Sequence, residues 1–171
     1  MTPAIVVRTA NEADAVGLLA LRQQVFAETD YMLWEPAEFK DTVADEAARI
    51  ARLNTTANSH FLVAMADDQP VGFCGVMGGG VNRLRHSASL ALGVLKSQWG
   101  RGVGYALLNE AVAHSAQAGI TRLELTVHTT NVRAICLYLR VGFEVEGLRR
   151  RSLRVRGDYV DEYLMSRLNE A

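Results

Sequence analysis

Three alternating glycines stand between a strand-like run and a helix-like run of the sequence. The strand-like run is Ser87–Val94, the glycines are Gly100, Gly102 and Gly104, and helical spacing of apolar residues begins near Leu107. At the start of a helix the backbone N–H groups have no partner and the helix dipole is positive, while glycine leaves no Cβ in the way of an anion. The pattern therefore predicts a cradle for a pyrophosphate group.

The same glycines match two common nucleotide-binding motifs poorly. A dinucleotide-binding fold needs an early parallel β-α-β unit and an acidic residue on the next strand, whereas this turn follows strands with an antiparallel pattern. The lysine and the hydroxyl of a P-loop are missing. A tight strand-to-helix turn, in which glycine relieves crowding, gives the same pattern, so the surrounding sequence decides.

A second block follows the glycine turn and contains Asn131, Ala134, Leu137-Tyr138 and Gly142-Phe143. Together the two blocks resemble the GNAT superfamily of N-acetyltransferases, whose acyl-CoA motif is Gln or Arg, two residues, Gly, one residue, then Gly or Ala. Gly102 and Gly104 fill the two glycine positions. Trp99 stands where the family has Gln or Arg, with Gln98 one place earlier, which puts one family contact to the phosphates in question.

The length and the lack of a linker indicate one domain, residues 1–171, and no metal is expected. The resemblance implies that it uses acetyl-CoA as co-substrate and acetylates an amine in a ternary complex. It also implies that the strands Ser87–Val94 and Arg122–Val127 splay apart, so that the pantetheine arm of acetyl-CoA pairs with the first like an added strand. The residues implied to contact acetyl-CoA are Leu92, Gly93, Val94, Trp99, Gly100, Arg101, Gly102, Val103, Gly104, Tyr105, Asn131, Ala134 and Tyr138.

The same resemblance implies catalytic roles within that set. A main-chain N–H near Val94 would stabilise negative charge on the thioester oxygen, and the Tyr138 hydroxyl would act as general acid toward the CoA sulfur. The Asn131 amide would orient the CoA arm. Taken alone, the residues also allow Tyr138 to be a half-buried aromatic of a helix and Asn131 to be a helix N-cap.

A general base is expected, because an amine is mostly protonated at neutral pH and must lose a proton before it attacks. The candidates are His86 at the start of a strand, Glu124 and His128 on the polar face of the next strand, and Glu35 in an upstream loop. The strand Ser87–Val94 carries no carboxylate, so solvent is a further candidate. The sequence does not choose among them.

The resemblance extends to the loop Tyr31–Pro36 and the hairpin Gly157–Glu162, and it implies that both lie beside the substrate. Their aromatic residues would suit an apolar amino acid or a small amine. The alternatives are a protein N-terminus, a CoA-binding sensor without catalysis, and a module that binds acidic partners through the basic run Arg149–Arg156. The expected substrate-binding residues are Tyr31, Met32, Trp34, Glu35, His128 and Tyr159.

The elements that must position these residues alternate between strand and helix periods, which predicts a mixed α/β fold. We expect a central, mostly antiparallel sheet of about seven strands with four helices on its faces, splayed between the fourth and fifth strands. The expected helices are Asp14–Phe26 with Asn11 as N-cap, a second helix with Pro36 in its first turn that continues through Glu38 to Leu53, about Gly104–Gly119, and Asn131–Arg140; the expected strands are Ile5–Val7, His60–Ala66, Val71–Met77, Ser87–Val94, Leu123–Val127, Phe143–Val145 and Tyr159–Met165.

Composition narrows the class of protein further. The chain has 171 residues with 18 Lys+Arg and 19 Asp+Glu, a net charge of -1 that argues against general nucleic-acid binding. The N-terminal apolar run is too short for a signal peptide and nothing approaches a membrane span, so a cytoplasmic protein is expected. Cys74 and Cys136 are expected to be buried, reduced thiols, the histidines lack metal-ligand spacing, and the resemblance makes a homodimer plausible.

Overall fold

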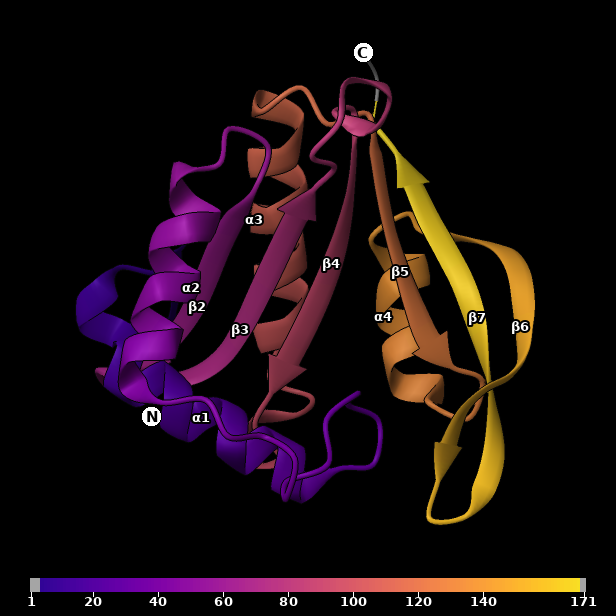
Figure 1. Cartoon of the computed structure of the whole chain (residues 1–171), viewed down its shortest axis with the longest axis horizontal. Helices are drawn as coiled ribbons and strands as arrows, with labels where there is room; N and C mark the ends of the chain where they lie inside the picture. Colours follow the sequence, from indigo (N-terminus) through magenta and orange to yellow (C-terminus); the bar gives the residue numbers. More distant parts are fainter. Residues whose placement is uncertain (1–3, 170–171) are drawn as a thin grey trace.

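The computed structural model describes residues 4–169 and contains one seven-stranded sheet with the order β1-β2-β3-β4-β5-β7-β6 (Figure 1). Neighbouring strands are antiparallel except β4 and β5, which are parallel. The predicted mixed, mostly antiparallel sheet is therefore confirmed. The strands are β1 Ile5–Thr9, β2 His60–Ala66, β3 Gln69–Gly78, β4 Ser87–Val94, β5 Arg122–His128, β6 Glu144–Val155 and β7 Asp158–Leu168. The single domain over 1–171 stays a prediction, and residues 1–3 and 170–171 lie outside the described part.

Four α-helices cover the two faces of the sheet, as predicted, and two hydrophobic clusters result. Because successive strand residues point to opposite faces, Phe61 and Val63 of β2 pack with α1 and α2, whereas Leu62 of β2 packs with α3 and α4. Among residues 4–169 no helix is long and apolar enough to cross a membrane. The helices are α1 Ala15–Glu28, α2 Val43–Thr55, α3 Val103–Gln117 and α4 Val132–Arg140, and the short 3-10 turns are η1 Glu12–Asp14, η2 Asn82–Leu84 and η3 Lys96–Gln98.

The second helix begins at Val43, later than the predicted start, which placed Pro36 in its first turn. Thr42 and Asp45 form a capping box, in which each side chain accepts a hydrogen bond from the other residue's backbone N–H, and this fixes the first turn. Upstream, the Phe39 ring makes an edge contact with Phe26 at 4.8 Å and lies under the Arg22 guanidinium. Residues 38–42 therefore form a loop that anchors Phe39 in the core.

The expected burial of both cysteines is wrong for one of them. Cys74 is fully buried in β3, whereas Cys136 is exposed on α4. The helix α4 is strongly amphipathic and buries Tyr138 against the sheet, so Cys136, two residues away, lies on the outer side.

The last two strands are also longer than predicted, because they form a twisted hairpin whose outer strand β6 is largely exposed.

The strands β4 and β5 are paired at one end only. Their register covers Ser87–Ser89 with Arg122–Glu124, which we call the closed end, and no pairing between them follows. The remaining parts, Leu90–Val94 and Leu125–His128, form the open end, where the two strands diverge (Figure 1). The predicted splay is confirmed.

Candidate active site

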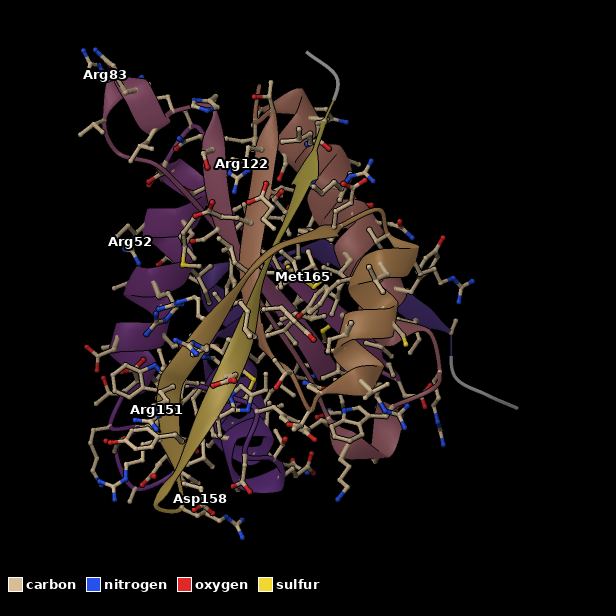
Figure 2. The ribbon with its side chains drawn as sticks, turned by 90° about the vertical axis from the view of Figure 1, so that its right-hand side faces the viewer. Arg52, Arg83, Arg122, Arg151, Asp158 and Met165 are labelled. Carbon is tan, nitrogen blue, oxygen red and sulfur yellow. The ribbon has the colours of Figure 1, made fainter. Side chains whose placement is uncertain are left out.

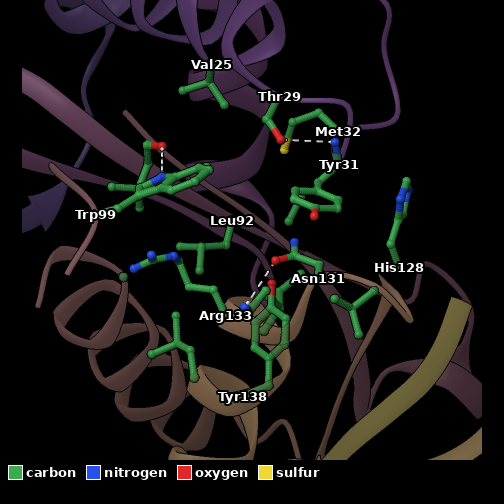
Figure 3. Close-up of a pocket in the computed structure, with 18 of the residues that line it drawn as sticks. Val25, Thr29, Tyr31, Met32, Leu92, Trp99, His128, Asn131, Arg133 and Tyr138 are labelled. Atoms are coloured by element: carbon green, nitrogen blue, oxygen red, sulfur yellow. Dashed lines mark hydrogen bonds between the residues drawn. The ribbon is translucent and has the colours of Figure 1, made fainter. Parts of the chain in front are cut away.

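A cavity of about 710 Å³ lies at the open end. It lies between the end of β4, the glycine turn, the first turns of α3 and α4, the end of β5, the loop after α1 and the β6–β7 hairpin. Figure 3 shows Trp99 and Arg133 on one side of it, His128 on the other, and Tyr31 and Tyr138 facing each other across it. Elements that are far apart in the chain thus meet at one hollow.

The end of β4 presents main-chain groups to this cavity. The N–H of Leu95 donates to Val71 O, and that of Gly79 to Ser87 O, so the odd-numbered residues of β4 bond to β3. Since alternate residues of an antiparallel strand bond to the same neighbour, the N–H groups of Leu92 and Val94 face the opposite way, toward the open end. This edge is therefore free to pair with an extended ligand.

The glycine turn has the geometry of an anion cradle. Gly100 and Gly102 have φ of 78° and 83°, values that favour glycine, and Gly102 is the N-cap of α3. A Cβ at Gly102 would have no heavy atom within 4 Å, whereas one at Gly104 would lie 2.9 Å from Leu137 Cδ2. The first N–H groups of α3 have no partner within the helix. A phosphate group therefore fits against the main chain at Gly102, while Gly104 lets α3 approach α4.

Trp99 and Arg133 form one side of the cradle. The Trp99 indole donates through Nε1 to Val94 O at 2.9 Å, and this bond joins the glycine turn to the end of β4. The Arg133 guanidinium carbon lies 5.2 Å from the centroid of the Trp99 ring, within the range of a cation–π interaction. The position where the resemblance places Gln or Arg thus holds an aromatic platform under an arginine from α4.

The helix α4 carries two polar groups into the cavity. The Asn131 side-chain oxygen accepts from the Ala134 N–H at 3.2 Å, so Asn131 is the N-cap of α4 and its amide NH₂ is left for other partners. Tyr138 is 7% exposed, and its hydroxyl end points toward the cavity (Figure 3). Burial, with a smaller contribution from Cys74, raises the pKa of Tyr138 above its usual value of 10. The Tyr138 hydroxyl is therefore protonated at physiological pH and can donate a hydrogen bond.

The far side of the cavity holds a buried histidine beside a buried glutamate. His128, at the end of β5, makes an edge contact with the Tyr31 ring at 5.5 Å, and its Nε2 has no hydrogen-bond partner among the described residues. Burial lowers the pKa of His128, which Glu162 and Asp30 partly oppose. Glu162 is 6% exposed, accepts from the Ser152 hydroxyl and lies 3.5 Å from an Arg149 nitrogen. A neutral imidazole and a carboxylate thus adjoin the same space.

Most of the predicted cofactor-binding residues line this one cavity. They are Leu92, Gly93, Val94, Trp99, Gly100, Gly102, Val103, Gly104, Tyr105, Asn131, Ala134 and Tyr138. Of the predicted substrate residues, Tyr31, Met32 and His128 line it as well. The exposed Arg101 side chain does not line the cavity.

Two candidate bases lie at the wrong end of the sheet. His86 precedes β4, and with about 3.3 Å per strand residue it is roughly 25 Å from Val94. Its carbonyl accepts the N–H groups of Thr121 and Arg122. Glu124 belongs to the closed end, where it accepts from Arg122 at 3.1 Å. Neither residue lines the cavity, so these two predictions are corrected.

Three predicted substrate residues also lie outside the cavity. Trp34 and Glu35 are exposed, because the chain turns away after Leu33 and the Glu35 backbone N–H bonds to the Glu38 carboxylate. Tyr159 is 61% exposed near the tip of the hairpin, with Arg151 and Arg154 over its ring. Alternation along β7 turns Glu162, and not Tyr159, toward the cavity.

Several lining residues were not predicted to belong to the site, and they include Gln98, Arg133, Leu137, Arg140, Arg149, Ser152, Leu153 and Glu162. Arg133 and Leu137 share a helix face with Ala134 and Tyr138, a spacing that was visible in the sequence. The position of Ser152 in the cavity could not be predicted from spacing in this way, because β6 shifts register between Arg149 and Leu153.

Comparisons with known proteins agree with this arrangement. The Acetyltransferase (GNAT) family model matches residues 20–143. The N-alpha-acetyltransferase RimI of Mycobacterium tuberculosis is 32% identical over 97% of this chain and 94% of its own. The L-amino acid N-acetyltransferase AaaT of Escherichia coli is 36% identical over 63% of this chain and 67% of its own. A GNAT acetyltransferase from Streptococcus pneumoniae, of known crystal structure, is 30% identical with a TM-score of 0.94 and covers 97% of this chain and 100% of its own. The protein therefore belongs to the GNAT family and is an N-acetyltransferase.

Proposed function

We propose that the protein transfers the acetyl group of acetyl-CoA to the primary amine of a small molecule, with apolar amino acids as the first candidates. The observation that carries this proposal is the open end, where an unpaired strand edge and a glycine turn border one cavity. The pyrophosphate would lie against the main chain at Gly100 and Gly102, and the pantetheine arm along Leu92–Val94. The Asn131 amide would donate to that arm.

The reaction needs one bond to form and one to break. The amine nitrogen forms an amide bond to the thioester carbon, and the carbon–sulfur bond breaks with its electron pair on sulfur. The Val94 N–H would donate to the carbonyl oxygen as negative charge develops there. Direct attack of the amine on the thioester in a ternary complex needs no covalent bond to the enzyme.

Tyr138 would supply the proton, or the hydrogen bond, that the leaving sulfur requires. A thiol has a pKa near 8.5, so the thiolate is a moderately basic leaving group. Burial keeps the Tyr138 hydroxyl protonated at neutral pH, and the hydroxyl points into the cavity (Figure 3). These two properties support Tyr138 as the general acid.

His128 would accept the proton that the amine loses, directly or through water. Of the four candidate side chains, it alone lines the cavity, and its free Nε2 is an acceptor in the neutral ring. Its lowered pKa keeps the imidazole neutral at physiological pH. Glu162 beside it would attract an ammonium ion before that proton is lost.

Apolar amino acids suit the substrate side of the cavity for two reasons. Tyr31, Met32 and Leu33 supply apolar surface, while Arg149 offers a cation to a carboxylate. The loop after α1 is also joined to the hairpin by an ion pair between Asp30 and Arg156 at 3.0 Å. We expect this link between the loop and the hairpin to hinder an extended polypeptide more than a small amine. AaaT, which acts on L-amino acids by its name, is among the relatives.

An amine panel assayed for thiol release from acetyl-CoA tests the proposal. Leucine, methionine and phenylalanine, polyamines and short peptides with an N-terminal alanine are compared at equal concentration. We expect the apolar amino acids to give the largest kcat/KM. A preference for peptides would contradict the small-molecule substrate and indicate a protein N-terminus, in line with the name of the relative RimI. CoA binding without turnover on any amine would leave the cofactor site but refute the enzyme reaction.

A further inference from the structure

Arg133 is a cation without a protein counterion at the rim of the cavity. Among residues 4–169 it forms no ion pair and no side-chain hydrogen bond, although the surface holds many such pairs. Its Nη1 lies 4.0 Å from the position that a Cβ at Gly100 would take, so the guanidinium stands directly beside the glycine turn. Arg133 lines the cavity together with Gly100 and Gly102.

The Arg133 side chain is held by a rigid support. The Trp99 ring lies under the guanidinium, and tryptophan is the aromatic side chain that attracts cations most strongly. The ring is itself fixed by the hydrogen bond from Nε1 to Val94 O. A long side chain that is oriented before binding loses less entropy when it meets a ligand. The stack thus presents the charge at one place, beside the main-chain cradle (Figure 3).

The positive charge of Arg133 does not stabilise the helix α4. Arg133 is its second residue, where the helix dipole is positive and an acidic residue is favoured, and the first turn of α4 contains no acidic residue. The N-terminus of α3 borders the same cavity. Two helix N-termini and a guanidinium therefore gather positive charge at one site, an arrangement that an anionic ligand would stabilise.

We propose that Arg133, stacked on Trp99, is the side chain that binds the pyrophosphate of acetyl-CoA. This inference rests on the proposed function, and the ligand class is a diphosphate ester, which a guanidinium contacts with paired N–H donors. The cation comes from α4, whereas the acyl-CoA motif that this chain resembles would supply a polar side chain at position 99. Trp99 orients Arg133 and bonds to β4, so it is a positioning residue.

Titration calorimetry with two ligands tests the assignment. CoA and dephospho-CoA share the pyrophosphate, and only CoA carries the 3′-phosphate. Arg133→Gln should weaken both by about tenfold, the low end of the range for a hydrogen bond to a charged group. Arg83→Gln is the matched control, because it removes one positive charge from η2, which does not line the cavity, and it should change neither affinity by more than twofold. Figure 2 shows Arg83 at the end of the molecule opposite to Arg151 and Asp158.

A truncated donor separates this role from a general loss of structure. Acetyl-pantetheine has no pyrophosphate, so Arg133→Gln should leave its kcat/KM within twofold of wild type while raising KM for acetyl-CoA. The double variant Trp99→Arg/Arg133→Gln moves the positive charge from position 133 to position 99. Its CoA affinity should be at least threefold higher than that of Arg133→Gln.

Three results would overturn the inference. They are an unchanged affinity of Arg133→Gln for CoA, an effect that disappears with dephospho-CoA and so belongs to the 3′-phosphate, and an equal loss of kcat/KM with acetyl-pantetheine. Failure of the wild-type protein to bind CoA at all would instead refute the proposed function.

Discussion

The two ends of the β4–β5 pair use polar groups in opposite ways. At the closed end, Arg122 donates to both carboxylate oxygens of Glu146 and to Glu124, and the Ser166 hydroxyl completes the network. Arg122 and Ser166 together lower the pKa of Glu146 to about 2. At the open end, the strand N–H groups of Leu92 and Val94 and the Nε2 of His128 lack such partners in the described chain.

This difference separates residues that hold the fold from residues that are available to a ligand. Figure 2 places Arg122 and Arg83 toward one end of the molecule and Arg151 and Asp158 at the other. The same two strands therefore supply structure at one end and a binding edge at the other. Polar residue type alone does not mark a site. Glu124 and His128 lie on one face of one strand, but Glu124 accepts a hydrogen bond from Arg122 at the closed end, whereas His128 lines the cavity at the open end.

The strongest test of the comparison places a carboxylate in the glycine turn. Gly102→Asp would strain a residue at φ 83° and set a negative charge where the pyrophosphate is proposed to lie, so we expect CoA affinity to fall at least about a hundredfold. Gly119→Asp is the matched control, since Gly119 has φ 74°, has open space around its Cβ and ends the same helix near the closed end. Calorimetry with CoA compares the two. Equal affinities in both variants would contradict the cradle.

Loss of the proposed acid should be the next largest effect. Tyr138→Phe keeps the ring packing and removes the hydroxyl, so kcat should fall about a hundredfold, the usual range for a general acid, while CoA affinity stays within threefold. Thiol release at saturating substrate measures kcat. Tyr163→Phe, outside the cavity on β7, is the control. Wild-type turnover in Tyr138→Phe, with chemistry limiting the rate, would remove Tyr138 from the mechanism.

A pH effect on stability should arise away from the cavity. Burial and the nearby His114 lower the pKa of His60 to about 4. The unfolded chain therefore binds more protons than the folded one between about pH 6.5 and 4, and stability falls as the pH falls through this window. Between pH 7 and pH 5, after allowance for solvent screening, we expect the free energy of unfolding to fall by about 1 kcal/mol. Urea unfolding at pH 7 and pH 5 measures it, and His60→Phe should abolish this part. CoA affinity at pH 7 should not change in that variant.

The smallest effect compares two residues of one strand. His128→Asn should lower kcat/KM about tenfold and remove the acid limb that we expect in the pH–rate profile of wild type, because the His128 imidazole, whose pKa lies below its usual value, can no longer take up a proton. Glu124→Gln, at the closed end of β5, should change kcat/KM less than twofold. A pH–rate profile of each variant with the best amine decides. A larger effect of Glu124→Gln than of His128→Asn would reverse the comparison.

The cofactor side of the site was largely predictable from the sequence, because main-chain binding requires glycines at fixed spacing and a strand before them. The substrate side was not. Ser152 reaches Glu162 through a register shift in β6, which no local pattern of the sequence reveals. Tyr159 lies on the face of β7 opposite to Glu162, because successive strand residues alternate. His86 and Glu124 lie outside the cavity because of the strand direction. His86 precedes β4 and Glu124 lies in the first half of the parallel strand β5, whereas the glycine turn follows the end of β4. The homodimer and the cytoplasmic location stay predictions.

The nine residues of α4 connect three separate tasks. Asn131 at its start, Arg133 in its first turn and Tyr138 five residues later are fixed by one rod with a rise of about 1.5 Å per residue. Inserting or deleting a single residue between Arg133 and Tyr138 would rotate one relative to the other by about 100° and abolish their joint use. We therefore expect insertions and deletions to be tolerated in the loops around the amine but not within this helix.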